Sequence, residues 1–332
     1  MKSYLVNVVL VNFVLFNLAE TLSLSSSNHI IQFKPSSIRT EAITQTYPET
    51  FLNKLFSSVP RREKAIDNIS LSFGHFDSIN EKKPLSETCG SGLSLLVGRS
   101  ASGKSTLLRI LAQMEEPKSG QMVLNGSSCF MHNQQKGENS HGIEMSMNEA
   151  SVAPKPIIID AKPDCFDTKS SLFQRILECI PEFSIDFQKQ EVNQQQLESL
   201  KENVVCEYAQ ILGFTLDQIH SYTPSDLTPS QQYLFGLVCS SVESSFAANL
   251  KLNEDNVLEI PRPILLLDEL LDKETSGVAN KVGDRLLNLT EKGGIVIAAT
   301  HRPQFLTGVA ERVVTLSSGK VLKVEYLDNL GA

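Results

Sequence analysis

Short apolar runs divide the body of the chain into predicted strands. Ile69, Leu71 and Phe73 alternate with polar residues, and this period of two predicts a strand with one face against a core. Continuous apolar runs at residues 264–267 and 295–299 predict fully buried strands. Residues 156–160 predict a short buried strand, and the short apolar run at residues 93–97 predicts another strand. Further strands are predicted at 121–124, 313–316 and 321–326. The Asn125-Gly126 pair predicts a tight hairpin turn.

Other stretches repeat their apolar residues at helical spacing. The helices predicted in this way cover about residues 172–180, 197–211 and 278–286. Another helix is expected to begin at Thr228, because Thr at the cap, Pro229 at the first helical position and Gln231 three residues after the cap form a capping box. Strands that alternate with helices predict an α/β fold whose largely parallel sheet is covered on both faces.

Two regions lack this regularity. Residues 127–156 are rich in Asn, Gln, Ser and Met, and predict an inserted surface loop. Residues 1–21 carry one early lysine and a mostly apolar run, which predicts a secretory signal peptide cleaved after Thr21, or alternatively an uncleaved membrane anchor. Residues 22–60 are rich in Ser and Thr and slightly basic, which predicts a disordered, transit-like segment ahead of a domain at 61–332.

The signal-like and transit-like segments together resemble the two-part address of plastids acquired by secondary endosymbiosis. A plastid is therefore the expected location, and a membrane-anchored or endomembrane location is the alternative.

Composition narrows the class of protein. The 332 residues are 41% hydrophobic and 20% charged, which is typical of a globular protein. A net charge of −8 argues against a large nucleic-acid-binding surface, so no specific nucleic-acid partner is expected. The six cysteines are scattered without a CxxC pair, which predicts reduced, partly buried thiols and neither a zinc site nor a disulfide framework.

A glycine-rich turn links the predicted strand 93–97 to a helical run. Its pattern, Gly, four residues, then Gly-Lys-Ser, is that of a phosphate-binding P-loop. Backbone N–H groups and the start of the helix would bind the phosphates, Lys104 would reach the β- and γ-phosphates, and Ser105 would help hold Mg²⁺. A serine-rich surface turn with one solvated lysine is the alternative. The candidate binding residues are Gly98, Arg99, Ser100, Ala101, Ser102, Gly103, Lys104, Ser105 and Thr106.

Polar groups also follow two of the buried strands. Asp268 and Glu269 end the run 264–267, and ligands of open α/β sheets bind at the carboxyl ends of strands. Asp268 is expected to hold Mg²⁺, and Glu269 to orient or deprotonate the attacking water. His301, just after the run 295–299, could hydrogen bond to the γ-phosphate or the water. The alternatives are an acidic loop and a surface histidine.

These motifs resemble the nucleotide-binding subunit of the ATP-binding cassette (ABC) family over roughly residues 66–324. The stretches that carry the resemblance are 105–113, 116–120, 124–126, Asp268-Glu269 and His301. It implies a P-loop NTPase fold with a mainly parallel sheet, an antiparallel β subdomain and a helical subdomain at about 168–245. It also implies ATP and Mg²⁺ as cofactors, a head-to-tail homo- or heterodimer around the nucleotide, and a separate membrane protein as a partner.

The sequence departs from the family pattern in four places. The family signature Leu-Ser-Gly-Gly-Gln reads Leu227-Thr-Pro-Ser-Gln231 here, so Thr228, Ser230 and Gln231 are candidate nucleotide contacts, although a plain helix cap explains them equally well. The family's Q-loop glutamine aligns with Ala161. Asp272 lies in an altered dimer-facing loop, where it could substitute. Phe73 and Phe76 are candidates for stacking on adenine, but Phe73 also fits a core position.

The leading hypothesis is an ABC-type ATPase with slow or conditional hydrolysis, in which Lys104, Glu269 and His301 act on the γ-phosphate. The alternative is a nucleotide-dependent switch or scaffold with little hydrolysis, which the altered signature favours and Glu269 disfavours. A small-molecule kinase on a P-loop fold fits the late Asp-Glu and Thr-His pairs less well.

Overall fold

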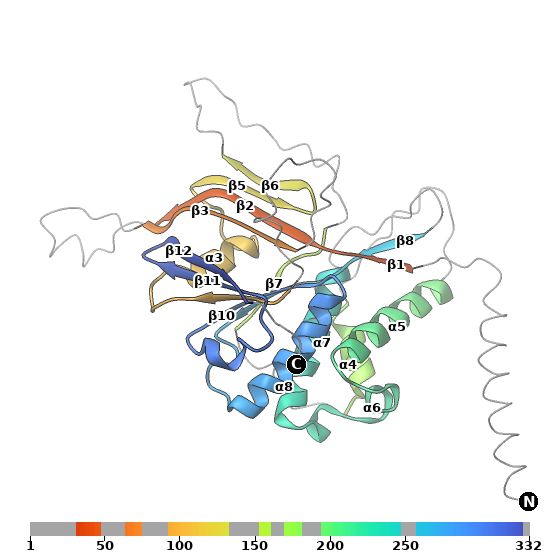
Figure 1. The fold of residues 1–332 in the computed structure, drawn as a ribbon. Helices are drawn as coiled ribbons and strands as arrows, with labels where there is room; N and C mark the ends of the chain where they lie inside the picture. Colours follow the sequence, from red (N-terminus) through yellow and green to blue (C-terminus); the bar gives the residue numbers. More distant parts are fainter. Residues whose placement is uncertain are drawn as a thin grey trace, which may run out of the picture.

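A computed structural model of the chain describes residues 31–47, 64–74, 92–132, 153–160, 169–180, 194–246 and 257–327 (Figure 1). Its strands are β1 (Ile31–Lys34), β2 (Ser37–Thr46), β3 (Lys64–Gly74), β4 (Ser94–Val97), β5 (Ser119–Leu124), β6 (Ser127–His132), β7 (Ile157–Ile159), β8 (Leu258–Pro261), β9 (Ile264–Asp268), β10 (Ile295–Thr300), β11 (Arg312–Ser317) and β12 (Lys320–Tyr326). Its α-helices are α3 (Lys104–Leu111), α4 (Leu172–Glu178), α5 (Gln194–Ile211), α6 (Leu216–Ser221), α7 (Pro229–Phe246) and α8 (Ser276–Glu291).

Six strands form the central sheet, in the order β12-β11-β4-β10-β9-β7. All neighbours are parallel except β11 and β12, which pair antiparallel around the turn at 318–319. The predicted parallel sheet is therefore confirmed. The non-consecutive strand order brings the carboxyl ends of β4, β10 and β9 side by side at one edge of the sheet.

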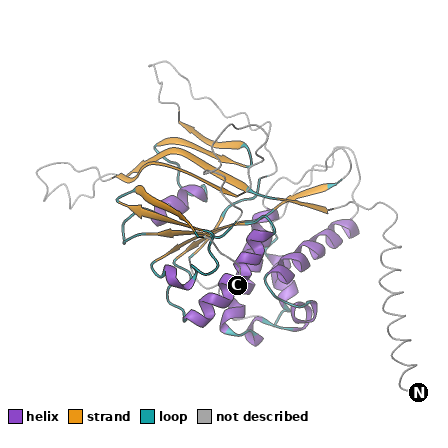
Figure 2. Ribbon diagram, in the orientation of Figure 1, coloured by secondary structure: helices purple, strands orange, loops and turns teal. Residues whose placement is uncertain are grey.

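The central strands divide their side chains between two cores. Leu265 and Leu267 of β9 pack with the helices of one face, while Ile264 and Leu266 pack on the opposite face. Because both faces are covered, these strands read as unbroken apolar runs. Figure 2 shows helices α4–α8 on one side of the sheet and the second sheet on the other, with α3 between the two sheets.

The second sheet is antiparallel, in the order β3-β2-β5-β6. β5 and β6 are joined by Asn125 and Gly126, which both have positive φ, 46° and 78°. This is the geometry of a type I′ turn, so the predicted hairpin is confirmed. The predicted surface loop at 127–156 is wrong at its start, because residues 127–132 pair with β5. Residues 133–152 lie outside the described residues.

The prediction that residues 22–60 are a disordered, transit-like segment is wrong for residues 31–47. β2 lies inside the antiparallel sheet between β3 and β5, and its Ile38 and Ile43 side chains are 0% exposed. β1 pairs in parallel with β8, which is distant from it in the sequence. The folded domain thus begins before residue 61. The composition did not indicate these strands, because Ser and Thr occupy many of their positions. The alternation of the buried Ile38 and Thr40 with more exposed residues was a usable signal.

Four helices, α4 to α7, make up the helical part. Ser171 caps α4 and Thr215 caps α6, each through a reciprocal capping box with a glutamine three residues later. The buried faces of these helices join the core on one side of the central sheet. No helix among the described residues combines the length and apolar character needed to cross a membrane.

We expect Ile38→Ala to lower the free energy of unfolding by about 2–5 kcal/mol, because it removes a fully buried side chain and leaves a cavity. Leu322→Ala on β12, where the side chain is 71% exposed, is the control and should change it by less than about 0.5 kcal/mol. Chemical denaturation of the full-length chain measures both. Equal, small effects would mean that β2 is not part of the cooperative core.

Candidate nucleotide site

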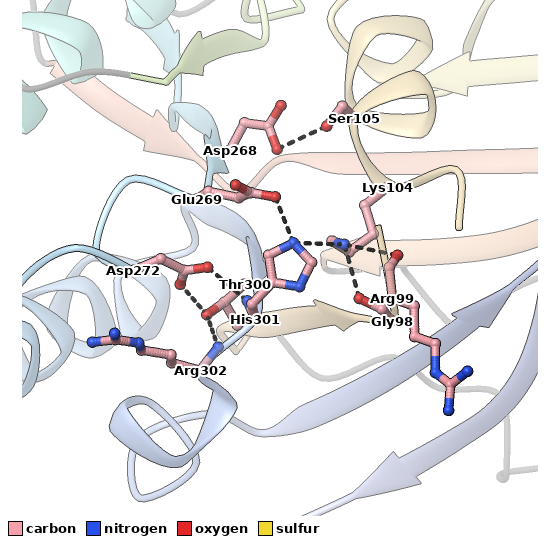
Figure 3. A network of polar contacts seen from close by, with 10 residues as sticks. All are labelled: Gly98, Arg99, Lys104, Ser105, Asp268, Glu269, Asp272, Thr300, His301 and Arg302. Atoms are coloured by element: carbon pink, nitrogen blue, oxygen red, sulfur yellow. Dashed lines mark hydrogen bonds and ion pairs between the residues drawn. The ribbon is translucent and has the colours of Figure 1, made fainter. Parts of the chain in front are cut away.

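The P-loop lies between β4 and α3, as its sequence predicts. Lys104, the first residue of α3, is only 5% exposed, and its Nζ donates to the backbone oxygen of Gly98 at 2.9 Å and to that of Arg99 at 3.4 Å. The lysine ammonium is thus folded against its own loop (Figure 3). Such a group can exchange these carbonyls for the more strongly charged oxygens of a phosphate.

Gly103 sets the bend of this loop. Its φ of 102° lies in the region that favours glycine, and a Cβ there would stand 2.5 Å from the backbone oxygen of Ala65. The loop is also hydrogen bonded to the β11–β12 turn, because Gly319 N donates to Ser102 O at 3.1 Å. The P-loop therefore lies close against β3 and is hydrogen bonded to the β11–β12 turn.

Ser105 lies against the end of β9. Its Oγ donates to Asp268 Oδ1 at 3.1 Å, across a long stretch of sequence. A hydroxyl and a carboxylate oxygen are hard ligands of the kind Mg²⁺ prefers, and Mg²⁺ usually keeps several waters and phosphate oxygens as its other ligands. The described residues hold no group of three or more His, Cys, Asp or Glu side chains that could bind a metal alone. The pair therefore fits a metal that arrives with a phosphate ligand.

Glu269 and His301 form an ion-pair contact beside Lys104. The distance from His301 Nε2 to Glu269 Oε1 is 2.8 Å, and that from His301 Nε2 to Lys104 Nζ is 3.5 Å. An Nε2–H that donates to the carboxylate has no lone pair for the ammonium, so the shorter distance marks the hydrogen bond. Glu269 has a φ of 56°, a strained value for a residue with a side chain, while its N–H still bonds to Ala299 O at 2.9 Å. The backbone thus aims this carboxylate at the P-loop side.

Asp272 fixes the segment that carries the histidine. Its Oδ2 accepts from the backbone N–H of His301 at 2.7 Å, and its Oδ1 accepts from the Thr300 hydroxyl. Thr300 Oγ1 in turn accepts from the N–H of Arg302 at 2.9 Å. The sequence singled out Asp272 as a substitute in an altered loop but gave no partner for it. In the structure it joins the segment after β9 to the segment after β10 (Figure 3).

A family model described as "ABC transporter" matches residues 85–204 of the chain. SapF of Escherichia coli (strain K12), named a putrescine export system ATP-binding protein, is 23% identical over 248 residues, 74% of this chain and 77% of SapF. These similarities support an ABC-type nucleotide-binding domain in this chain. The sulfate/thiosulfate import ATP-binding protein CysA of Mesostigma viride is 25% identical over 260 residues, 78% of this chain and 60% of that protein.

Solved ABC structures share the fold of this domain. The ADP conformation of MJ1267, an ATP-binding cassette of an ABC transporter, superposes with a TM-score of 0.55 at 13% identity, covering 88% of this chain and 92% of that one. CbiO1 from Clostridium perfringens, part of the ABC transporter complex cbiONQ, gives 0.55 at 12% identity, covering 90% and 91%. The predicted fold class is confirmed.

The altered signature of the ABC domain lies at the start of α7, apart from the P-loop. Gln231 Oε1 accepts from the Thr228 N–H at 3.1 Å and from the Thr228 hydroxyl at 2.8 Å, and the Thr228 and Ser230 hydroxyls are 3.5 Å apart. The predicted helix start is confirmed, with the glutamine serving the cap. Among the described residues, no hydrogen bond or ion pair joins these three side chains to Lys104 or Asp268.

The prediction that Phe73 stacks on adenine is wrong. Its side chain is 1% exposed, and the guanidinium of Arg312 lies 4.5 Å from the ring centroid. Both faces of the ring are therefore unavailable to a ligand, because Phe73 follows the inward alternation of β3. Phe76, the other candidate, and Ala161, the proposed Q-loop position, lie outside the described residues.

Tyr47 is an exposed aromatic residue next to α3 that the sequence analysis did not single out. It follows β2, is 41% exposed, and its hydroxyl lies 3.4 Å from Thr106 Oγ1 and 2.8 Å from Glu115 Oε2. Burial raises the pKa of this hydroxyl above its ordinary value. An aromatic residue at the end of an alternating run could have indicated Tyr47. The Ser- and Thr-rich composition of residues 22–60 predicted a disordered segment there instead.

We expect Asp272→Ala to lower the free energy of unfolding by about 2 kcal/mol, since it removes a charged acceptor of two hydrogen bonds. Denaturant titration of the full-length chain measures the change. Asp284→Ala, an exposed acid on α8, is the matched control and should have little effect. If the two variants were equally stable, Asp272 would not anchor the His301 segment.

Proposed function

We propose that this ABC domain binds ATP with Mg²⁺ and hydrolyses it. One observation carries the proposal: the ends of β4, β10 and β9 bring Lys104, the Ser105–Asp268 pair and the Glu269–His301 pair together. A lysine for the phosphates, a hydroxyl–carboxylate pair for Mg²⁺ and a carboxylate that can orient water fit phosphoryl transfer to water.

Each group has a distinct task in this reaction. Lys104 leaves the carbonyls of Gly98 and Arg99 and binds the β- and γ-phosphates. Ser105 and Asp268 would hold the metal, which when bound neutralises phosphate charge and so assists departure of the leaving group. Glu269 orients the attacking water and accepts its proton, while His301 Nε2 donates a hydrogen bond that keeps the Glu269 carboxylate in place.

The adenine side of the site is proposed at Tyr47. Its hydroxyl contacts Thr106, which lies in the first turn of α3. An exposed ring beside the helix that binds the phosphates can stack on the base of the same nucleotide.

A second subunit and a membrane protein are the proposed partners. Among the residues that the structure describes, no hydrogen bond or ion pair joins the Thr228–Gln231 cap to the P-loop of its own chain. We infer that a nucleotide would meet both between two copies, or between this chain and a related one. The names of the relatives, ATP-binding proteins of transport systems, support a separate transport protein. The plastid location stays a prediction, and a removable address would have to end before Ile31.

A nucleotide-dependent switch with little hydrolysis is the second candidate, and one observation favours it. Pro229 has no N–H for a phosphate, and Gln231 is already bonded to Thr228. A weakened signature slows hydrolysis without removing nucleotide binding. Turnover by the Glu269 variant, below, separates the two.

We expect Lys104→Ala to weaken ATP binding by about 10–100-fold, the cost of losing charge-assisted hydrogen bonds to phosphate. Titration calorimetry with MgATP on the full-length chain measures it. Lys281→Ala, an exposed lysine on α8, is the control and should bind as the wild type does. Unchanged affinity in Lys104→Ala would remove the P-loop from the proposed site.

We expect Glu269→Gln to keep nucleotide affinity while its turnover falls on the order of a hundredfold, because the amide cannot accept a proton from water. Steady-state phosphate release measures turnover, with Glu291→Gln, an exposed position, as the control. Wild-type turnover as low as that of Glu269→Gln would favour the switch. Measurable turnover that Glu269→Gln leaves intact would contradict the assigned base.

A further inference from the structure

Two cysteines from separate helices meet in the helical part of the domain. Cys179 directly follows α4, and Cys239 lies within α7, which packs against α4. The two side chains are hydrogen bonded to each other, and both residues are half-buried. Neither thiol belongs to the nucleotide site.

The hydrogen bonds around Cys179 indicate which thiol of the pair donates and which sulfur accepts. Its thiol donates to the backbone oxygen of Arg175 at 3.4 Å, so its sulfur is left to accept from the Cys239 S–H. A sulfur that accepts from a neighbouring thiol is stabilised as the thiolate, as in Cys-X-X-Cys sites. Cys179 is therefore the nucleophile of the pair.

The charges around the pair are mixed. The hydrogen bond from Cys239 is the largest influence and lowers the pKa of the Cys179 thiol, with a smaller contribution from Arg175. Burial, Glu243 and Glu178 act in the opposite direction, and the net shift is downward. For Cys129 and Cys206, in contrast, burial raises the pKa of each thiol. The two sets of cysteines should therefore differ in reactivity.

We propose that Cys179 and Cys239 form a reversible intramolecular disulfide that joins α4 to the signature helix α7. The oxidant is a small disulfide, RSSR, such as oxidised glutathione. The Cys179 thiolate attacks one of its sulfurs, the S–S bond of RSSR breaks, and RS⁻ leaves from the mixed disulfide on Cys179. Cys239 gives its proton to this RS⁻ and attacks Cys179 Sγ, which releases a second RS⁻ that takes a proton from water.

Atoms and electrons balance in this reaction. Two cysteine thiols are oxidised to one disulfide, and RSSR is reduced to two RSH. Excess RSH reverses both steps. The link would fix the end of α4 to the middle of α7, the helix that carries Thr228 and Ser230 at its start. It would thus make the placement of the altered signature depend on the redox state.

The experiment equilibrates the reduced full-length chain, without nucleotide, in buffers of rising oxidised-to-reduced glutathione ratio. Free thiols are then alkylated, and each cysteine is followed by peptide mass spectrometry. We expect Cys179 and Cys239 to lose alkylation together, in a linked peptide pair about 2 Da lighter than the same two peptides with free, unalkylated thiols, at ratios where Cys206 is still fully alkylated. Cys239→Ser should instead trap a glutathione adduct on Cys179, and the control Cys206→Ser should behave as the wild type.

Two results would overturn the proposal. One is that Cys179 and Cys239 stay alkylated at ratios where Cys206 already carries glutathione. The other is that either cysteine pairs with a different cysteine. The measurement detects the disulfide by mass and uses no ATP. A negative result would therefore contradict the disulfide proposal without bearing on the proposed ATPase activity.

Discussion

The register of three neighbouring parallel strands is the constraint on which the site depends. Val97, the last residue of β4, pairs with Thr300 of β10, and Ala299 of β10 pairs with Asp268 of β9. The chain leaves all three strands at the same level, so the P-loop, the two acids and the histidine emerge at one edge. A slip of one residue in either pairing would turn alternate side chains to the opposite face and separate Ser105 from Asp268.

Much of this arrangement could be predicted from local sequence. Buried strands, the Asn125-Gly126 turn and the P-loop all have short-range causes: apolar burial, positive φ and a glycine-dependent bend. The contacts of Asp272 could not be predicted, because they join segments whose proximity only the strand order determines. For residues 31–47 the composition gave a wrong prediction, because partly exposed strands and targeting segments are both rich in Ser and Thr.

The start of α7, which carries the altered signature, is held by different contacts. The polar groups of the Thr228 cap are hydrogen bonded within the cap itself. Further along α7, the Tyr233 hydroxyl donates to Glu274 Oε1 at 2.6 Å, in the segment that follows Glu269. Burial and this carboxylate raise the pKa of Tyr233, so the hydroxyl keeps its proton and the contact persists. The signature helix and the segment after Glu269 are thus linked within one subunit.

The pairing of β1 with β8 has a consequence for the order of folding. Of the described strands, β1, at the red end of the ribbon in Figure 1, is synthesised first, yet its parallel neighbour β8 is made only after residue 257. The earliest strand must therefore wait, unpaired, for most of translation, and contacts between such distant parts of a chain form slowly. Nascent protein would expose this edge to chaperones or to aggregation until β8 is complete.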